Sequence, residues 1–134
     1  MTRPDRPGAK RRLSLLLVDD FADARMLFGD LLQLSHFDVL EAGSGAAALS
    51  AAIERRVDVV IVDLGLPDFD GLEVARRLRA DPRTAGIAVI LLTASDDDSD
   101  LRERARLAGC AEVLCKPCTA VELSETLCRL GIDS

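Results

Sequence analysis

The chain has 134 residues, which is enough for one domain with a substantial core, and a second folded domain is not expected. Hydrophobic residues make up 49% of the chain and charged residues 30%, a balance typical of a globular protein rather than a disordered one. The net charge of −6 argues against a nucleic-acid-binding surface on the domain, because phosphates would be repelled.

The first twelve residues differ from the rest in charge. Residues 1–12 carry five basic side chains and one acidic one, a net charge of +4, which leaves −10 for the remainder. We expect a basic flexible tail here, with a partner-binding or nucleic-acid-binding arm as the alternative, and a domain over residues 13–131. The longest apolar runs are too short to cross a bilayer, so a soluble, cytoplasmic protein without membrane insertion is expected.

Behind the tail, apolar runs of strand length alternate with amphipathic segments of helix length. The predicted strands cover residues 13–18, 37–42, 57–62, 87–93 and 111–115, and the predicted helices cover 21–34, 44–55, 71–80, 98–108 and 119–130. The first, third and fourth runs are apolar at nearly every position, as expected of parallel strands covered on both faces. The sequence therefore predicts an α/β fold, a doubly wound (βα)5 parallel sheet of strand order 2-1-3-4-5.

Polar residues stand at the ends of four predicted strands. Asp19 and Asp20 follow the first strand, Asp63 follows the third, Thr93 ends the fourth and Lys116 follows the fifth. Because parallel strands end at one edge of the sheet, these side chains should meet beside the switch point between strands 1 and 3. Three adjacent carboxylates repel one another without a cation, and Mg²⁺ prefers such oxygen ligands. With a lysine and a hydroxyl nearby, this is a set of groups for phosphoryl transfer to Asp63.

Four segments carry a family resemblance: LLLVDD (15–20), VDLGLPDFDGLE (62–73), LLTA (91–94) and CKP (115–117). In order and spacing they resemble the response-regulator receiver domains of two-component signalling, over about residues 13–131. The resemblance implies the flavodoxin-like, CheY-like fold. It also implies that Asp63 accepts a phosphoryl group, in a Mg²⁺-dependent reaction, from a histidine kinase or phosphotransfer protein.

The resemblance further implies a role for each residue of the site. The metal would be held by Asp19, Asp20, Asp63 and the backbone carbonyl of Gly65. The phosphoryl group would be bound and sensed by Thr93, Ala94, Lys116 and Pro117, with the bond before Pro117 in cis. Receivers usually carry a switch aromatic three positions before the lysine, but here that position is Val113.

As a function we expect a single-domain receiver without an output domain, a phosphoacceptor signalling protein rather than an enzyme, which promotes its own aspartyl phosphorylation and dephosphorylation. It would bind a downstream protein through the face formed by the fourth helix, the fifth strand and the fifth helix, in a phosphorylation-dependent way. The alternative is a phosphorylation-independent receiver-like scaffold or adaptor, which the valine at position 113 favours.

The motif Cys115-Lys116-Pro117-Cys118 allows a further alternative, a dithiol oxidoreductase. A CxxC pair at the start of a helix, beside a lysine, would have a lowered thiol pKa. Against this reading, thioredoxin-like folds carry the motif after an early strand rather than the last one. The four cysteines are expected to be reduced, since no export signal is recognised.

Three other patterns have simpler explanations. Gly43, Gly45 and Ala48 match a dinucleotide fingerprint, but five strands are too few for two mononucleotide halves, so a tight turn with Ser44 near the helix start is favoured. The acidic run 95–100 fails the calcium-loop pattern and is expected to favour the N-terminus of the fourth helix. The single His36 is expected to be a solvated loop residue.

Overall fold

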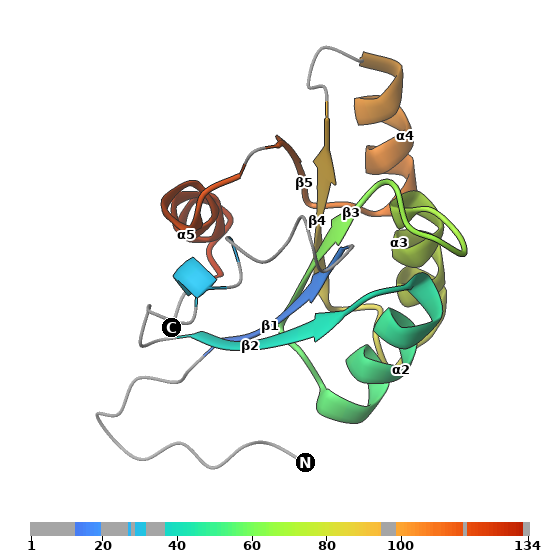
Figure 1. Cartoon of the computed structure of the whole chain (residues 1–134). Coiled ribbons are helices and arrows are strands. Elements are labelled where there is room, and N and C mark those ends of the chain that lie inside the picture. Colours follow the sequence, from blue (N-terminus) through green and yellow to red (C-terminus); the bar gives the residue numbers. More distant parts are fainter. Residues whose placement is uncertain are drawn as a thin grey trace.

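The computed structural model describes residues 13–19, 27, 29–31, 37–94, 99–116 and 118–132 (Figure 1). Several predictions therefore lie outside the described residues: the tail over 1–12, Asp20, His36, most of the acidic run, and Pro117. Within the described part of the chain, no helix is long and apolar enough to span a membrane.

The five strands are β1 (Leu13–Val18), β2 (Phe37–Ala42), β3 (Val59–Asp63), β4 (Ala88–Thr93) and β5 (Glu112–Cys115). They form one parallel sheet of order β2-β1-β3-β4-β5, which confirms the predicted topology. The strand ends after β1 and β3 therefore lie next to each other, at the predicted switch point.

The third strand begins two residues later than predicted. The side chain of Asp58 accepts a hydrogen bond from the backbone N–H of Ser14 at 2.8 Å, the N–H of Asp58 donates to the carbonyl of Ser14 at 2.8 Å, and regular pairing of β3 with β1 starts at Val59 with Leu15. Val57 is still buried, which explains why the hydrophobic pattern extended to it. The strand also continues through Asp63.

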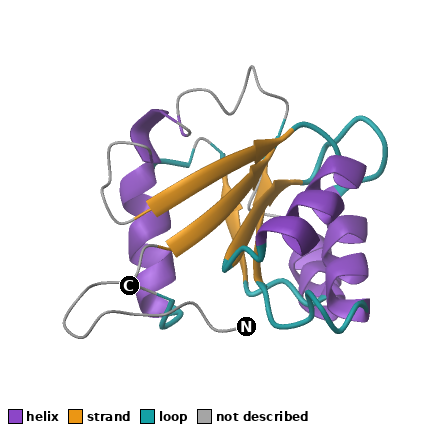
Figure 2. Ribbon diagram, turned by 90° about the horizontal axis from the view of Figure 1, so that it is seen from below, coloured by secondary structure: helices purple, strands orange, loops and turns teal. Residues whose placement is uncertain are grey.

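Four helices are described in full: α2 (Gly45–Arg55), α3 (Gly71–Ala80), α4 (Ser99–Ala108) and α5 (Ala120–Arg129). Leu27 and residues 29–31 are also helical, within the segment predicted as the first helix. Helices α2, α3 and α4 cover one face of the sheet and α5 covers the other, so that the sheet lies between helices (Figures 1 and 2).

The core is divided by the sheet into two layers. Alternate residues of one strand contribute to different layers, because successive side chains of a strand point to opposite faces. Leu16 and Val18 of β1 pack with residues of α2, α3 and α4, while Leu15 and Leu17 pack with Leu31 and residues of α5. Both layers are apolar, which accounts for the nearly continuous hydrophobic strands.

Helix α3 starts directly against the end of β3. The backbone N–H of Gly71 donates to the carbonyl of Leu64 at 3.0 Å, and the N-cap Asp70 accepts from the N–H of Glu73 at 2.9 Å. A Cβ atom at Gly71 would lie 2.5 Å from the carbonyl oxygen of Asp63. Only glycine therefore allows the helix to approach this strand so closely.

Helix α2 is capped by two different segments. Ser44, its N-cap as expected from the sequence, accepts a hydrogen bond from the N–H of Ala47 at 3.1 Å. The carboxylate of Asp68 accepts from the N–H groups of Gly45 and Ala46 at 2.8 and 2.9 Å. These backbone hydrogen bonds, that from Ala46 first and that from Gly45 next, lower the pKa of the Asp68 carboxyl from 3.8 to about 2.

Replacement of Gly71 by alanine is expected to lower the free energy of unfolding by about 1–3 kcal/mol, because the new methyl group would contact backbone that cannot move freely. Gly86→Ala is the matched control: no atom lies within 4 Å of its Cβ position, and a change within about 0.5 kcal/mol is expected. Urea unfolding followed by circular dichroism measures both, since the chain has no Trp or Tyr. Equal stabilities of the two variants would contradict the close approach at Gly71.

The contribution of Asp68 to stability should depend on pH. Its carboxyl has a lower pKa folded than unfolded, so the unfolded state takes up a proton first as the pH falls. The wild type should be more stable than Asp68→Asn above about pH 4, with the difference shrinking as the pH falls toward 2. Urea midpoints across this range measure it. Ser44→Ala removes a cap from the same helix without removing a titratable group. The difference in stability between this variant and the wild type should therefore stay nearly constant across the same pH range.

Candidate functional site

The structure places the predicted site residues at the carboxyl edge of the sheet. Asp19 directly follows β1, Asp63 ends β3, Thr93 ends β4 and Lys116 directly follows β5. Asp19, Asp63 and Thr93 are 3%, 9% and 5% exposed, although each carries a polar side chain. Three strands thus bring buried polar side chains to one edge, and β5 adds Lys116, whose side chain is 27% exposed; the register of the sheet positions all four.

Lys116 joins two of the carboxylates. Its ammonium nitrogen lies 2.9 Å from Oδ2 of Asp63 and 3.6 Å from Oδ2 of Asp19. Its backbone N–H donates to the carbonyl of Thr93 at 2.7 Å, which holds the end of β5 beside the end of β4. Because both carboxylates are buried, the lysine supplies charge neutralisation that water supplies elsewhere.

These carboxylates suit a hard cation. Asp19 and Asp63 already share one positive charge, and carboxylate oxygens are ligands that Mg²⁺ prefers. Gly65 is exposed on the loop after β3, with no atom within 4 Å of its Cβ position. The predicted third carboxylate, Asp20, is outside the described residues, and among the residues that are described no three acidic, His or Cys side chains form a metal-binding group.

Two positions next to the site differ in their surroundings. Ala94 is exposed, and its carbonyl accepts a hydrogen bond from Sγ of Cys115 at 3.7 Å. Val113, at the position where the resemblance implies an aromatic residue, is 8% exposed and belongs to the core layer that contains Leu101 and Ala105 of α4. The side chain of Val113 is therefore already packed inside.

One thiol of the cysteine motif differs from what the motif predicts. Cys115 and Cys118 are free and partly buried. Burial, and then the negative charge of Glu122, raise the pKa of the Cys118 thiol to about 11. The prediction of a lowered thiol pKa was therefore wrong for Cys118, because the thiol is partly buried and lies near an acidic side chain.

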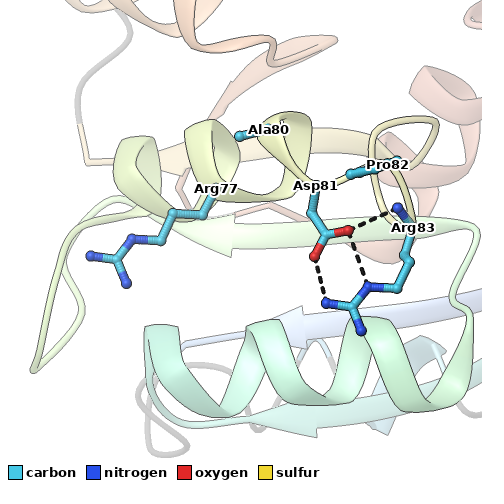
Figure 3. Close-up of a pocket in the computed structure, with 5 residues that line it drawn as sticks. All are labelled: Arg77, Ala80, Asp81, Pro82 and Arg83. Carbon is cyan, nitrogen blue, oxygen red and sulfur yellow. Dashed lines mark hydrogen bonds and ion pairs between the residues drawn. The ribbon is translucent and has the colours of Figure 1, made fainter.

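A surface pocket of about 610 Å³ lies at the other end of α3, lined by Arg77, Ala80, Asp81, Pro82 and Arg83 (Figure 3). Asp81 accepts hydrogen bonds from the side chain of Arg83 at 3.1 and 2.7 Å, which lowers the pKa of its carboxyl. The guanidinium of Arg77 extends away from this pair (Figure 3). It bonds instead to Glu73, at 2.9 Å. Both arginines are thus paired with carboxylates, and the pocket is separate from the carboxyl-edge site.

Sequence reasoning missed the role of Asp68. The segment DFDG (68–71) carried a prediction only as part of the family motif over 62–73, whereas Asp68 accepts hydrogen bonds from the N-terminus of α2 and Asp70 caps α3. The sequence contained one indication of this role. The first turn of α2 has no acidic residue of its own, so a carboxylate from another segment can interact favourably with the helix dipole there.

Comparisons with known proteins agree with this geometry. The family profile described as response regulator receiver domain matches residues 15–128. The polar-differentiation response regulator DivK of Brucella anthropi is 34% identical over 114 residues, which cover 85% of this chain and 92% of DivK.

Two solved structures are similar over nearly the whole domain. The chemotaxis response regulator CheY4 of Vibrio cholerae has a TM-score of 0.80 at 27% identity, covering 89% of this chain and 98% of that one. The receiver domain of a sensor histidine kinase of Pseudomonas aeruginosa, with a magnesium ion coordinated in its active site cleft, has a TM-score of 0.76 at 30% identity and covers 88% and 96%. With its sheet order, its edge of buried polar residues and these relatives, the chain belongs to the response-regulator receiver family of two-component signalling.

Proposed function

We propose that this chain is a response-regulator receiver in which Asp63 accepts a phosphoryl group from a histidine kinase or a phosphotransfer protein. The observation that carries the proposal is the contact of Lys116 with two buried carboxylates, 2.9 Å from Asp63 and 3.6 Å from Asp19. A buried carboxylate beside a lysine and a threonine is suited to receive a group that brings further negative charge.

In the proposed reaction a carboxylate oxygen of Asp63 forms a bond to phosphorus while the bond between phosphorus and the donor histidine nitrogen breaks. The imidazole nitrogen keeps the bonding electron pair and takes a proton from solvent. Lys116 remains next to the acceptor and offsets the added charge. The chain thus supplies position and charge rather than turnover of a substrate, and it promotes its own phosphorylation and dephosphorylation.

The reaction is proposed to depend on Mg²⁺, which would be held by Asp19, Asp20, Asp63 and the backbone carbonyl of Gly65. Bound there, the ion would neutralise phosphoryl oxygens during transfer. Support comes from the two buried carboxylates of Asp19 and Asp63, which both lie next to the ammonium of Lys116. It also comes from the magnesium ion in the Pseudomonas aeruginosa receiver domain.

The signal is proposed to pass from the site to a partner protein through α4, β5 and α5. Thr93, Ala94, Lys116 and Pro117 would bind and sense the phosphoryl group, shifting a two-state equilibrium in the adjacent elements. Leu107 on α4 and Val121 on α5 are 69% and 68% exposed, and apolar side chains at the surface favour protein contact. The protein is proposed to act in the cytoplasm, with residues 13–131 as the signalling domain.

A scaffold that acts without phosphorylation is the second candidate, and the buried Val113 favours it. The position where receivers usually carry a switch aromatic is occupied by Val113. Its small aliphatic side chain is packed in the core and only 8% exposed. Partner binding that is equally strong for the wild type and Asp63→Asn would support the scaffold.

Incubation with a small acyl phosphate and Mg²⁺ should add the mass of one phosphoryl group, measured by intact-protein mass spectrometry. The gain should be absent in Asp63→Asn and after chelation of the metal, because the nucleophile or its countercharge is then missing. Asp70→Asn is the matched control, since asparagine also caps helices, and it should be modified normally. A wild type that gains no mass from either the acyl phosphate or a cognate kinase would rule out the proposed function.

Removal of the lysine charge should tighten Mg²⁺ binding. Lys116→Met leaves the carboxylates of Asp19 and Asp63 without this ammonium, so a divalent cation should bind them roughly 3- to 10-fold more tightly, while phosphorylation becomes slower. Isothermal titration calorimetry measures the binding. Lys116→Arg, which keeps the charge, should stay near the wild type, and weaker Mg²⁺ binding by Lys116→Met would contradict the electrostatic account.

A further inference from the structure

The loop of residues 64–71, which runs from β3 to α3, is fixed by backbone hydrogen bonds at both ends. The N–H of Leu64 donates to the carbonyl of Leu92 on β4 at 2.9 Å, and the carbonyl of Leu64 accepts from the N–H of Gly71 at 3.0 Å. Between these ends Gly65, Pro67 and Asp68 are exposed. Only the loop ends are fixed by these bonds, so the conformation of the middle depends on other contacts.

One such contact is the link between Asp68 and α2. The two carboxylate oxygens of Asp68 accept hydrogen bonds from Gly45 and Ala46, 23 and 22 residues earlier in the chain. The N–H of Phe69 also donates to Asp68, at 2.9 Å, which orients the carboxylate from within the loop. A short polar side chain is thus held by three backbone groups.

An apolar contact reinforces this link. The ring of Phe69 lies so close to Gly45 that a Cβ atom there would collide with it. The ring of Phe69 also contacts Arg77, whose guanidinium carbon is 4.1 Å from the ring centroid. The side chain of Arg77 donates a hydrogen bond to Glu73 at 2.9 Å. Polar and apolar contacts therefore act on the same two segments.

The arrangement differs from the other well-described helix starts. Helices α3 and α5 carry an acidic residue in their own first turn, Glu73 and Glu122, whereas α2 carries none. The negative charge at the N-terminus of α2 comes instead from Asp68 of the loop. Helix capping and loop attachment thus depend on one carboxylate.

We propose that Asp68 is a positioning residue of the phosphoacceptor site, which holds the loop after Asp63 against α2 and so fixes the backbone carbonyl of Gly65 for Mg²⁺. This inference rests on the proposed function, which assigns that carbonyl to the metal. Asp68 itself lies outside the group of ligands and acts through the loop backbone.

The physical reason is preorganisation. A metal ligand on a loop with more conformational freedom must be ordered when the ion binds, and this cost lowers the affinity. Loss of Asp68 would increase that freedom without removing a ligand. A purely structural cap, by contrast, would change the stability of the protein and leave its affinity for Mg²⁺ unaltered.

The experiment compares Asp68→Ala with Ser44→Ala in the full chain. Both variants remove a side-chain hydrogen bond from the N-terminus of α2, but only Asp68 connects that helix end to the loop. Calorimetric titration with MgCl2 gives the affinity, thermal unfolding followed by circular dichroism gives the stability, and amide hydrogen exchange reports on residues 64–71 directly.

Both variants should lose some thermal stability. Asp68→Ala should also bind Mg²⁺ about 5- to 10-fold more weakly and exchange its loop amides faster, while Ser44→Ala keeps the wild-type affinity within about twofold. An Asp68→Ala protein with wild-type affinity, or with unchanged exchange in residues 64–71, overturns the inference alone. A wild type that binds no Mg²⁺ overturns the metal dependence of the proposed function and this inference with it.

Discussion

The site depends on the ammonium of Lys116, which lies between the buried carboxylates of Asp63 and Asp19. Two buried negative charges next to each other are unfavourable, and a positive group close to both offsets their repulsion. Lys116 follows β5, which is separated from β3 by β4, so the position of its side chain depends on the order and register of the strands. The sheet is therefore the part of the fold on which the chemistry rests.

The register explains why residues distant in sequence meet there. Asp63 is paired with Leu92, one residue before Thr93, and Thr93 is paired with Cys115, one residue before Lys116. Each step along the strand order thus places the next polar group at the same edge. A shift of one residue in any strand would turn the side chain of Asp63, Thr93 or Lys116 toward the opposite face.

The sequence predicted the topology and the location of the site because both follow from strong periodic signals. Strands β1 and β2 and helix α3 begin and end at the predicted residues, and the buried polar residues Asp19, Asp63 and Thr93 occupy the predicted edge. Asp19 and Lys116 lie beside Asp63 as the strand order requires. Asp20, Pro117 and the tail over 1–12 remain predictions, since they lie outside the described residues.

What the sequence did not reveal came from contacts between side chains and backbone of distant segments. Asp58, just before β3, bonds to Ser14 through its side chain, and the capping of α2 involves Asp68 as well as Ser44. Neither contact has a periodic pattern. The thiol of Cys118 shows the same limit, because its surroundings include Glu122 and a partly buried position that the spacing of a CxxC motif does not specify.

The hydrogen bond between Leu64 and Gly71 also fixes a length. It closes the intervening residues into a ring, and α3 cannot move closer to β3 to adjust the ring, because Gly71 already lies against the carbonyl of Asp63. Substitutions inside the ring change its chemistry, but an inserted or deleted residue must break its closure. The number of residues between Asp63 and α3 is thus constrained by the backbone contacts at the two ends of the loop.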